Sequence, residues 1–155
     1  MEPDEEPFEA DPPRPDAPPN PVNVRACGAI QRGAAAPVPV MGQEVFSMDA
    51  PAIASDEKLY RVAIPPRAGA ASHVTFTAPA AGEYVLFVSA PVAVPLTVFA
   101  IDGDLVDVKL RLRIPECPEV NGRHSVQLQA AKYVVRLGPE RLPSADVVVL
   151  PATGP

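Results

Sequence analysis

The chain has 155 residues, the size of one domain with or without a tail, and its 47% hydrophobic content is normal for a protein with a packed core. No apolar stretch is long enough to span a bilayer. The net charge of −6 comes from the first 22 residues, because the remainder carries 12 of the 19 acidic and 12 of the 13 basic side chains. A neutral body lacks the basic footprint of nucleic-acid-binding proteins, so we expect no nucleic-acid partner.

Residues 1–22 combine acidic side chains with proline. The acids are Glu2, Asp4, Glu5, Glu6, Glu9, Asp11 and Asp16, and eight of the 22 prolines lie in the first 21 positions. Such a composition buries little apolar surface, so it predicts a disordered leader that acts as a spacer or as a docking peptide for a basic partner. Acids rather than an apolar segment follow Met1, so we see no signal peptide. This arrangement is typical of an envelope protein whose signal has been removed, and a cytosolic protein is the alternative.

The body, residues 23–150, shows a hydrophobic period of two from residue 43 onward, and residues 151–155 form a short tail. In "VDVKLRLRI", residues 106–114, apolar side chains alternate with charged ones, as in a strand with one wet face. "EYVLFVS" and "PLTVFAI" are apolar on both faces, as a covered central strand would be. Further strands are predicted in "QEVFSM", "LYRVAI", "HVTFTA", "HSVQLQ", "KYVVRLG" and "DVVVL".

Turn signals separate these segments, and Asp102-Gly103 between two strong strands is the clearest hairpin signal. We find no helical apolar period of useful length. Eight or nine short strands at this spacing predict an all-β protein, an antiparallel β-sandwich of jelly-roll or Ig-like type.

Two segments of the body echo each other. Residues 73–91 read "HVTFTAPAAGEYVLFVSAP" and residues 124–139 read "HSVQLQAAKYVVRLGP". In both, a short strand ends at an Ala-Ala corner and the chain continues into a strand led by Tyr84 or Tyr133. A tyrosine just past a corner can bury its ring while its hydroxyl caps a nearby backbone group. We therefore expect one structural corner that is used twice.

The segments "FTAPAAGEYVLFVS", "IDGD" and "HSVQLQAAKYVVRLGP" resemble the bacterial pre-peptidase C-terminal type of β-sandwich domain, over about residues 43–150. The chain departs from that pattern at Lys132, where the second corner lacks the usual glycine. Members of that family are mostly non-catalytic appendages of secreted or surface proteins and sometimes bind calcium. The resemblance implies an accessory module of the cell envelope.

The two cysteines, Cys27 and Cys117, stand 90 positions apart. A disulfide between them would join the first strand to a late loop and would stabilise the fold by roughly 4 to 5 kcal/mol at most. It would also place the protein outside a reducing cytosol. Two free buried thiols are the alternative.

His73 and His124 are candidate metal ligands, with Cys27, Cys117, Met41 and Met48 completing a copper set. The chain has none of the local His-x-x-x-His or Cys-x-x-Cys spacings of metal sites. We therefore expect each histidine to lie solvated on the polar face of a strand.

Three aspartates, Asp102, Asp104 and Asp107, loosely resemble a calcium loop but supply too few oxygen ligands. Asp102 is expected at its position because aspartate favours turns, and Asp107 is expected on the solvent-exposed face of a strand. Calcium or copper is thus a minor alternative to having no cofactor.

Catalysis is not expected. Ser72-His73 and His124-Ser125 are adjacent in sequence, which points the two side chains of each pair to opposite faces of a strand. The sequence also contains no Gly-x-Ser-x-Gly elbow and no phosphate-binding loop.

Two surface features remain. Lys109, Arg111 and Arg113 form a basic row, which is either an edge kept soluble or a groove for an anionic glycan or the acidic leader. The C-terminal "LPATG" matches the pentapeptide cleaved by sortases, although only Pro155 follows it. Its residues are Leu150, Pro151, Ala152, Thr153 and Gly154.

The sequence therefore favours a non-catalytic module of the cell envelope, periplasm or exterior that acts by contact with another envelope protein or a glycan. It would have no membrane span and could form homo-oligomers. The alternatives are a carrier of a metal or small ligand that uses His73 and His124, and a sortase-anchored surface or pilus-like subunit.

Overall fold

The computed structural model describes residues 19–38, 49–66 and 69–152, and within them it contains one helix and eleven strands. The elements are α1 (Pro21–Arg32), β1 (Ala36–Val38), β2 (Ala52–Ile53), β3 (Tyr60–Ala63), β4 (Ser72–Thr77), β5 (Gly82–Ser89), β6 (Leu96–Ala100), β7 (Leu105–Val106), β8 (Lys109–Arg111), β9 (Gly122–Leu128), β10 (Lys132–Leu137) and β11 (Ser144–Pro151). The expected strand "QEVFSM" and most of the leader lie outside the described residues.

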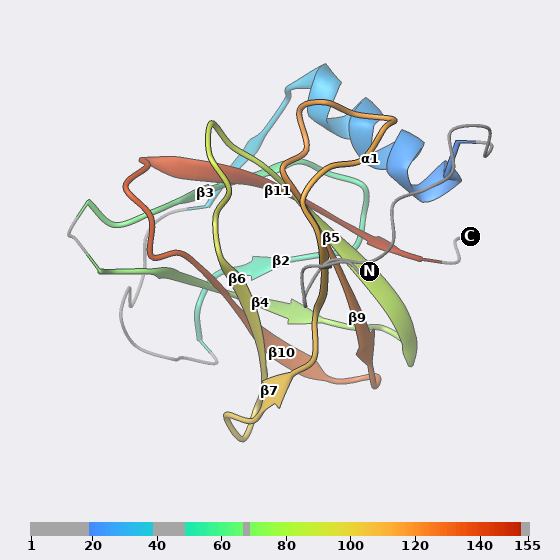
Figure 1. Cartoon of the computed structure of the whole chain (residues 1–155). Coiled ribbons are helices and arrows are strands. Elements are labelled where there is room, and N and C mark those ends of the chain that lie inside the picture. The colour runs from blue at the N-terminus through green and yellow to red at the C-terminus, as the bar shows by residue number, and fades with distance from the viewer. Residues whose placement is uncertain (1–18, 39–48, 67–68, 153–155) are drawn as a thin grey trace, which may run out of the picture.

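The strands form two sheets that pack face to face, which confirms the predicted β-sandwich (Figure 1). The six-stranded sheet has the order β1-β3-β11-β5-β9-β8, and the five-stranded sheet has the order β2-β4-β10-β6-β7. Most neighbours are antiparallel, but β1 runs parallel to β3 and β2 runs parallel to β4. The two sheets are therefore mixed. The short strands β1 and β2 are part of the reason why the structure has more strands than the eight or nine predicted.

The main core lies between the sheets and is filled mainly by valine, leucine and the rings of Phe76, Tyr84 and Tyr133. A second cluster lies on the other face of the six-stranded sheet, beneath α1 and the loop before β9. Strand β5 contributes to both, because Leu86 belongs to the main core while Phe87 belongs to the second cluster. The prediction that β5 is central and covered on both faces is thus confirmed.

Helix α1 is an element that the sequence analysis missed. The Asn20 side chain caps it by accepting hydrogen bonds from the N–H groups of Val22 and Asn23, and Pro21 occupies its first turn. Gly33 ends the helix in the left-handed conformation, with φ of 70°. The predicted leader boundary at residue 22 therefore falls inside a helix that covers β11 and β5 (Figure 1).

The expected strand over residues 106–114 is two strands. Val106 ends β7 at the edge of the five-stranded sheet, and Lys109 begins β8 at the edge of the six-stranded sheet. The chain crosses between the layers at Asp107 and Val108, so alternation continues although the sheet changes. The hairpin at Asp102-Gly103 is confirmed, because it joins the antiparallel pair β6 and β7.

The two echoing segments are two arches between the sheets. The first runs from β4 in the five-stranded sheet to β5 in the six-stranded sheet, and the second runs from β9 back to β10. Both tyrosine corners form as predicted: the Tyr84 hydroxyl donates to the Ala80 carbonyl at 2.7 Å, and the Tyr133 hydroxyl accepts from the Gln129 N–H at 2.8 Å.

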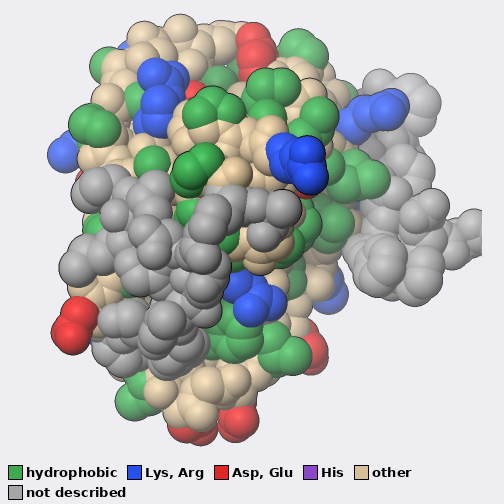
Figure 2. All heavy atoms as spheres, turned by 90° about the vertical axis from the view of Figure 1, so that its left-hand side faces the viewer, with side chains coloured by type: hydrophobic (Ala, Val, Ile, Leu, Met, Phe, Trp, Pro, Cys, Tyr) green, Lys and Arg blue, Asp and Glu red, His purple; other side chains and the backbone are tan. Residues whose placement is uncertain are grey.

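Acidic, basic and apolar side chains are mixed on one face of the sandwich (Figure 2). On the face drawn in Figure 2, neither charge gathers into one large patch, and hydrophobic side chains are scattered between the charged ones. This distribution agrees with the even balance of charge in the body of the chain.

Candidate ligand-binding site

An apolar hollow of about 590 Å³ opens between the sheets, where β8 and β9 at the edge of one sheet face β6 of the other. Its lining residues are Ala93, Val94, Pro95, Leu96, Val108, Leu110, Leu112, Asn121, His124 and Glu140. Most of this wall is aliphatic, and three polar side chains interrupt it. A concave apolar site with a few polar groups is typical of small-molecule binding.

His124 is the buried polar residue of the hollow. His124 lies two and four positions before Val126 and Leu128 in β9, so all three side chains share one face of the strand. Val126 and Leu128 belong to the main core, so the imidazole lies on the inner face of the sheet. Only 3% of its surface is exposed, and Nδ1 lies 3.1 Å from the Leu86 carbonyl oxygen. A carbonyl can only accept, so Nδ1 carries the proton and Nε2 keeps its lone pair. Burial lowers the pKa of His124 to about 4, against the smaller raising effect of the Leu86 carbonyl.

Gly122 and Asn121 fix the surroundings of this imidazole. A Cβ on Gly122 would lie 2.6 Å from Cε1 of His124, so the ring occupies space that a side chain would need. The Asn121 amide donates through Nδ2 to the Ala90 carbonyl at 2.6 Å. Its Oδ1 is buried without a hydrogen-bond partner. The acceptor that the polar end of the hollow offers is therefore Nε2 of His124.

The opposite wall comes from β8 and the residues that follow it. Leu110 pairs with His124 across the two antiparallel strands, so both face the interior. Leu112, further along, remains 39% exposed. Glu140 adds a carboxylate to the lining. This side of the sandwich is open because no strand continues the six-stranded sheet beyond β8 among the described residues.

The structure does not bring His73 and His124 together. His73 alternates with Val74 and Phe76, which face the main core, so it lies on the outer face of the five-stranded sheet. The expectation that both histidines are solvated is wrong, because His73 is only 4% exposed and His124 is 3% exposed. The other proposed copper ligands, Met41 and Met48, lie outside the described residues.

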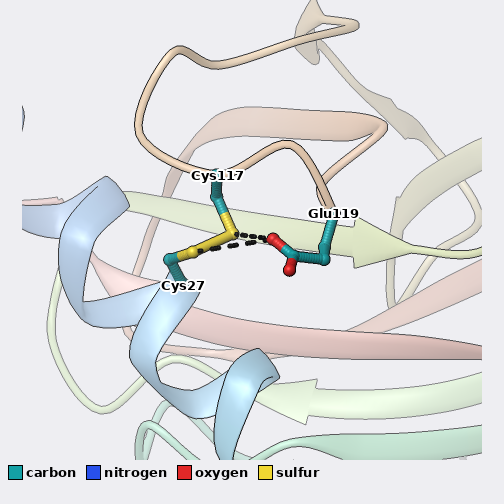
Figure 3. A group of neighbouring side chains, drawn as sticks. All are labelled: Cys27, Cys117 and Glu119. Carbon is teal, nitrogen blue, oxygen red and sulfur yellow. Dashed lines mark hydrogen bonds between the residues drawn. A yellow bond between two sulfur atoms is a disulfide. The ribbon is translucent and has the colours of Figure 1, made fainter.

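Cys27 and Cys117 form a disulfide between α1 and the loop before β9, with 5.5 Å between their Cα atoms (Figure 3). The bridge joins a helix, not the expected first strand, to that loop. Glu119 points a carboxylate oxygen at the bridge, 3.2 Å from the Cys117 sulfur. These three side chains are the one group of possible metal ligands in the described part of the chain. Both sulfurs are engaged in the disulfide, so neither is a thiolate ligand here.

The three aspartates of the possible calcium loop are exposed and separate. Asp102 caps its own turn by accepting from the Asp104 N–H at 3.0 Å, as expected. Asp107 lies in the crossing between β7 and β8, not on the wet face of a continuous strand.

The basic row stands at the free edge of the six-stranded sheet. Lys109 and Arg111 belong to the edge strand β8, and Arg113 follows it. On the neighbouring strand β9, Nε of Arg123 donates a hydrogen bond to Oδ1 of Asn23 in α1 at 2.8 Å. The guanidinium of Arg123 lies over the Phe87 ring, with 5.8 Å between Cζ and the ring centroid. Burial lowers the pKa of Arg123, and the like charge of Arg111 lowers it further.

The "LPATG" segment begins inside the fold. Leu150 is 1% exposed in the second cluster, and Pro151 ends β11 opposite Tyr84. Ala152 donates its N–H to the Glu83 carbonyl. Thr153 and Gly154 lie outside the described residues. A peptidase that binds this segment in extended form would first have to detach Leu150 from its cluster.

Comparison with family models found no match, and comparison with curated proteins found none either. The resemblance to the pre-peptidase C-terminal type therefore stays a prediction. Within the described residues, no helix is long and apolar enough to cross a membrane.

The hollow itself was not predicted. The sequence indicates His124 as a candidate, but as a metal ligand on a polar face. The available signal was Gly122 two positions before a histidine in a strand, since a glycine inside a strand often marks a close approach.

Proposed function

We propose that this protein is a non-catalytic binding module of the cell envelope or exterior, and that it holds an apolar ligand in the hollow beside His124. The observation that carries this proposal is the combination of an aliphatic wall, an opening between the sheets and a buried polar end. A cavity of about 590 Å³ lies within the usual range of roughly 300 to 1,000 Å³ for small-molecule sites. The disulfide supports the location, because such bridges persist in oxidising compartments.

The test is binding of a fluorescent apolar probe, 2-methoxynaphthalene, to the full chain. Leu112→Asp places a charge on the wall of the hollow and should weaken binding at least tenfold. Leu105→Asp is the matched control, because Leu105 is 70% exposed and does not line the hollow. Absence of binding to the wild type, or equal loss in both variants, would overturn the proposal.

A second candidate function is contact with an anionic glycan or an acidic protein through the basic row. Lys109, Arg111 and Arg113 extend along a sheet edge that no other strand covers among the described residues. Replacing all three with serine should abolish retention on a sulfated-glycan column at low salt if the row is such a site. Unchanged retention would contradict this second function. The basic row would then serve to prevent the edge strand from pairing with other sheets.

A further inference from the structure

The polar groups of the hollow restrict the chemistry of its ligand. We infer that the ligand is a small neutral alcohol or phenol, with an apolar body and one hydroxyl group that donates a hydrogen bond to Nε2 of His124. This inference rests on the proposed function and names the class of ligand that the same site would take.

The first step is the direction of hydrogen bonding. The proton of the imidazole is committed to the Leu86 carbonyl through Nδ1, so Nε2 can only accept. One N–H of the Asn121 amide donates to the Ala90 carbonyl, and its Oδ1 is an acceptor that is buried without a hydrogen-bond partner. The third polar side chain of the lining, Glu140, ends in a carboxylate, another acceptor when ionised. A ligand that bonds to Nε2 of His124 must bring a donor.

The second step is the rigidity of the acceptor. A Cβ on Gly122 would lie 2.6 Å from Cε1 of His124, and the neighbouring ring atom, Nδ1, is hydrogen-bonded to the Leu86 carbonyl. The imidazole is therefore fixed in one orientation before a ligand arrives. Its low pKa, about 4, keeps it neutral at physiological pH, so the lone pair of Nε2 is available there. A preorganised acceptor loses little conformational entropy when the ligand binds.

The third step is charge. No cationic side chain lies among the described residues that line the hollow, and an ionised Glu140 would repel a carboxylate or phosphate. A cationic ligand would have to leave water for a mostly aliphatic cavity, where Glu140 could attract it but the neutral His124 gives it no counter-charge. A neutral donor avoids both costs. The burial of His124, with 3% of its surface exposed, favours a slim small molecule over the broad surface of a protein.

The experiment compares three probes that share one aromatic body: 2-naphthol, 2-methoxynaphthalene and 2-naphthoate. At pH 7 we expect 2-naphthol to bind wild-type protein roughly threefold to tenfold more tightly than the methoxy compound, which is the usual value of one net hydrogen bond. 2-Naphthoate should bind most weakly. In His124→Phe, which keeps a ring but loses Nε2, the preference for naphthol over the methoxy compound should disappear.

A second measurement keeps the test independent of that variant's folding. The ¹⁵N resonance of His124 Nε2 in the wild type should move upfield on addition of 2-naphthol, as expected for a ring nitrogen that accepts a hydrogen bond, and move much less with the methoxy compound. Equal affinity for these two probes, or tightest binding of 2-naphthoate, would overturn the alcohol inference and leave the proposed binding function standing. If none of the three probes binds, the proposed function itself fails.

Discussion

Removal of the Cys27–Cys117 disulfide should destabilise the protein by about 2 to 4 kcal/mol. The bridge closes a loop of 90 residues, for which the chain-entropy model gives about 4.6 kcal/mol at 25 °C. The actual loss should be smaller, because residual structure in the reduced, unfolded chain limits the entropy that it gains. The folded helix keeps other contacts with the body. Val22 and Ala26 remain buried in the second cluster, and Glu116 still accepts hydrogen bonds from the Asn20 N–H and the Asn23 amide.

The assay is urea unfolding of the wild type and of a double Cys→Ala variant at these two positions. Alanine avoids burying a hydroxyl at sites that are 5% and 0% exposed. For a chain of this size, 3 kcal/mol corresponds to a fall in Tm of about 6 to 12 °C. Reductant should lower the stability of the wild type to that of the variant, and it should leave the variant unchanged, which serves as the internal control.

The loss of local stability should be greatest in helix α1. Twelve residues are too few for a stable isolated helix, so α1 depends on its attachment to the sheet. Hydrogen exchange of its amides should accelerate in the Cys→Ala variant more than exchange in β5. Equal unfolding midpoints with and without reductant, with free thiols confirmed by mass, would refute the reasoning.

Three further predictions follow from single residues. Tyr84→Phe removes the donor to the Ala80 carbonyl and should cost about 1 kcal/mol in urea unfolding; no loss would mean that water replaces the bond. Gly122→Ala places a Cβ against His124 and should cost about 1 to 3 kcal/mol, whereas Gly28→Ala in α1, a control with space for the methyl group, should be neutral or stabilising. The pKa of His124 falls from 6.5 to about 4 on folding, so the unfolded chain binds the proton first as pH drops. Stability should therefore be complete above pH 6.5 and fall by about 3 kcal/mol toward pH 4, and the part due to His124 should vanish in His124→Phe.

The layers of the fold were predictable because side-chain alternation is a local property. Strand β5 carries apolar residues on both faces, and this pattern alone indicated a central strand covered twice. Alternation does not report which sheet a strand joins. Val106, Val108 and Leu110 stay on the inner side while the chain passes from β7 to β8, so the crossing at Asp107 left no sign in the sequence. The predicted alternation does not hold at Ile114, which lies in the second cluster on the other face of the six-stranded sheet.

Helix α1 was missed for a different physical reason. Its buried face is built from small side chains, Ala26, Cys27 and Ala29, together with Val22, so the hydrophobic period is weak although the packing is close. The termini carried the stronger signals, with Asn20-Pro21 at the start and Gly33 at the end. Cap residues were thus more informative than periodicity for a short helix that is fastened by a disulfide.

The two arches that begin near His73 and His124 pack against each other. β4 pairs with β10 and β5 pairs with β9, so the arches pack against each other and place Phe76 beside Tyr133 and Val126 beside Tyr84. All four of these side chains face the main core.

His73 stands three positions before Phe76, whereas His124 stands two positions before Val126. Because side chains alternate between the faces of a strand, an odd separation turns the first imidazole outward and an even one turns the second into the hollow. Sequence similarity between the segments therefore indicates a shared backbone unit, and a single residue of spacing decides which histidine faces the hollow.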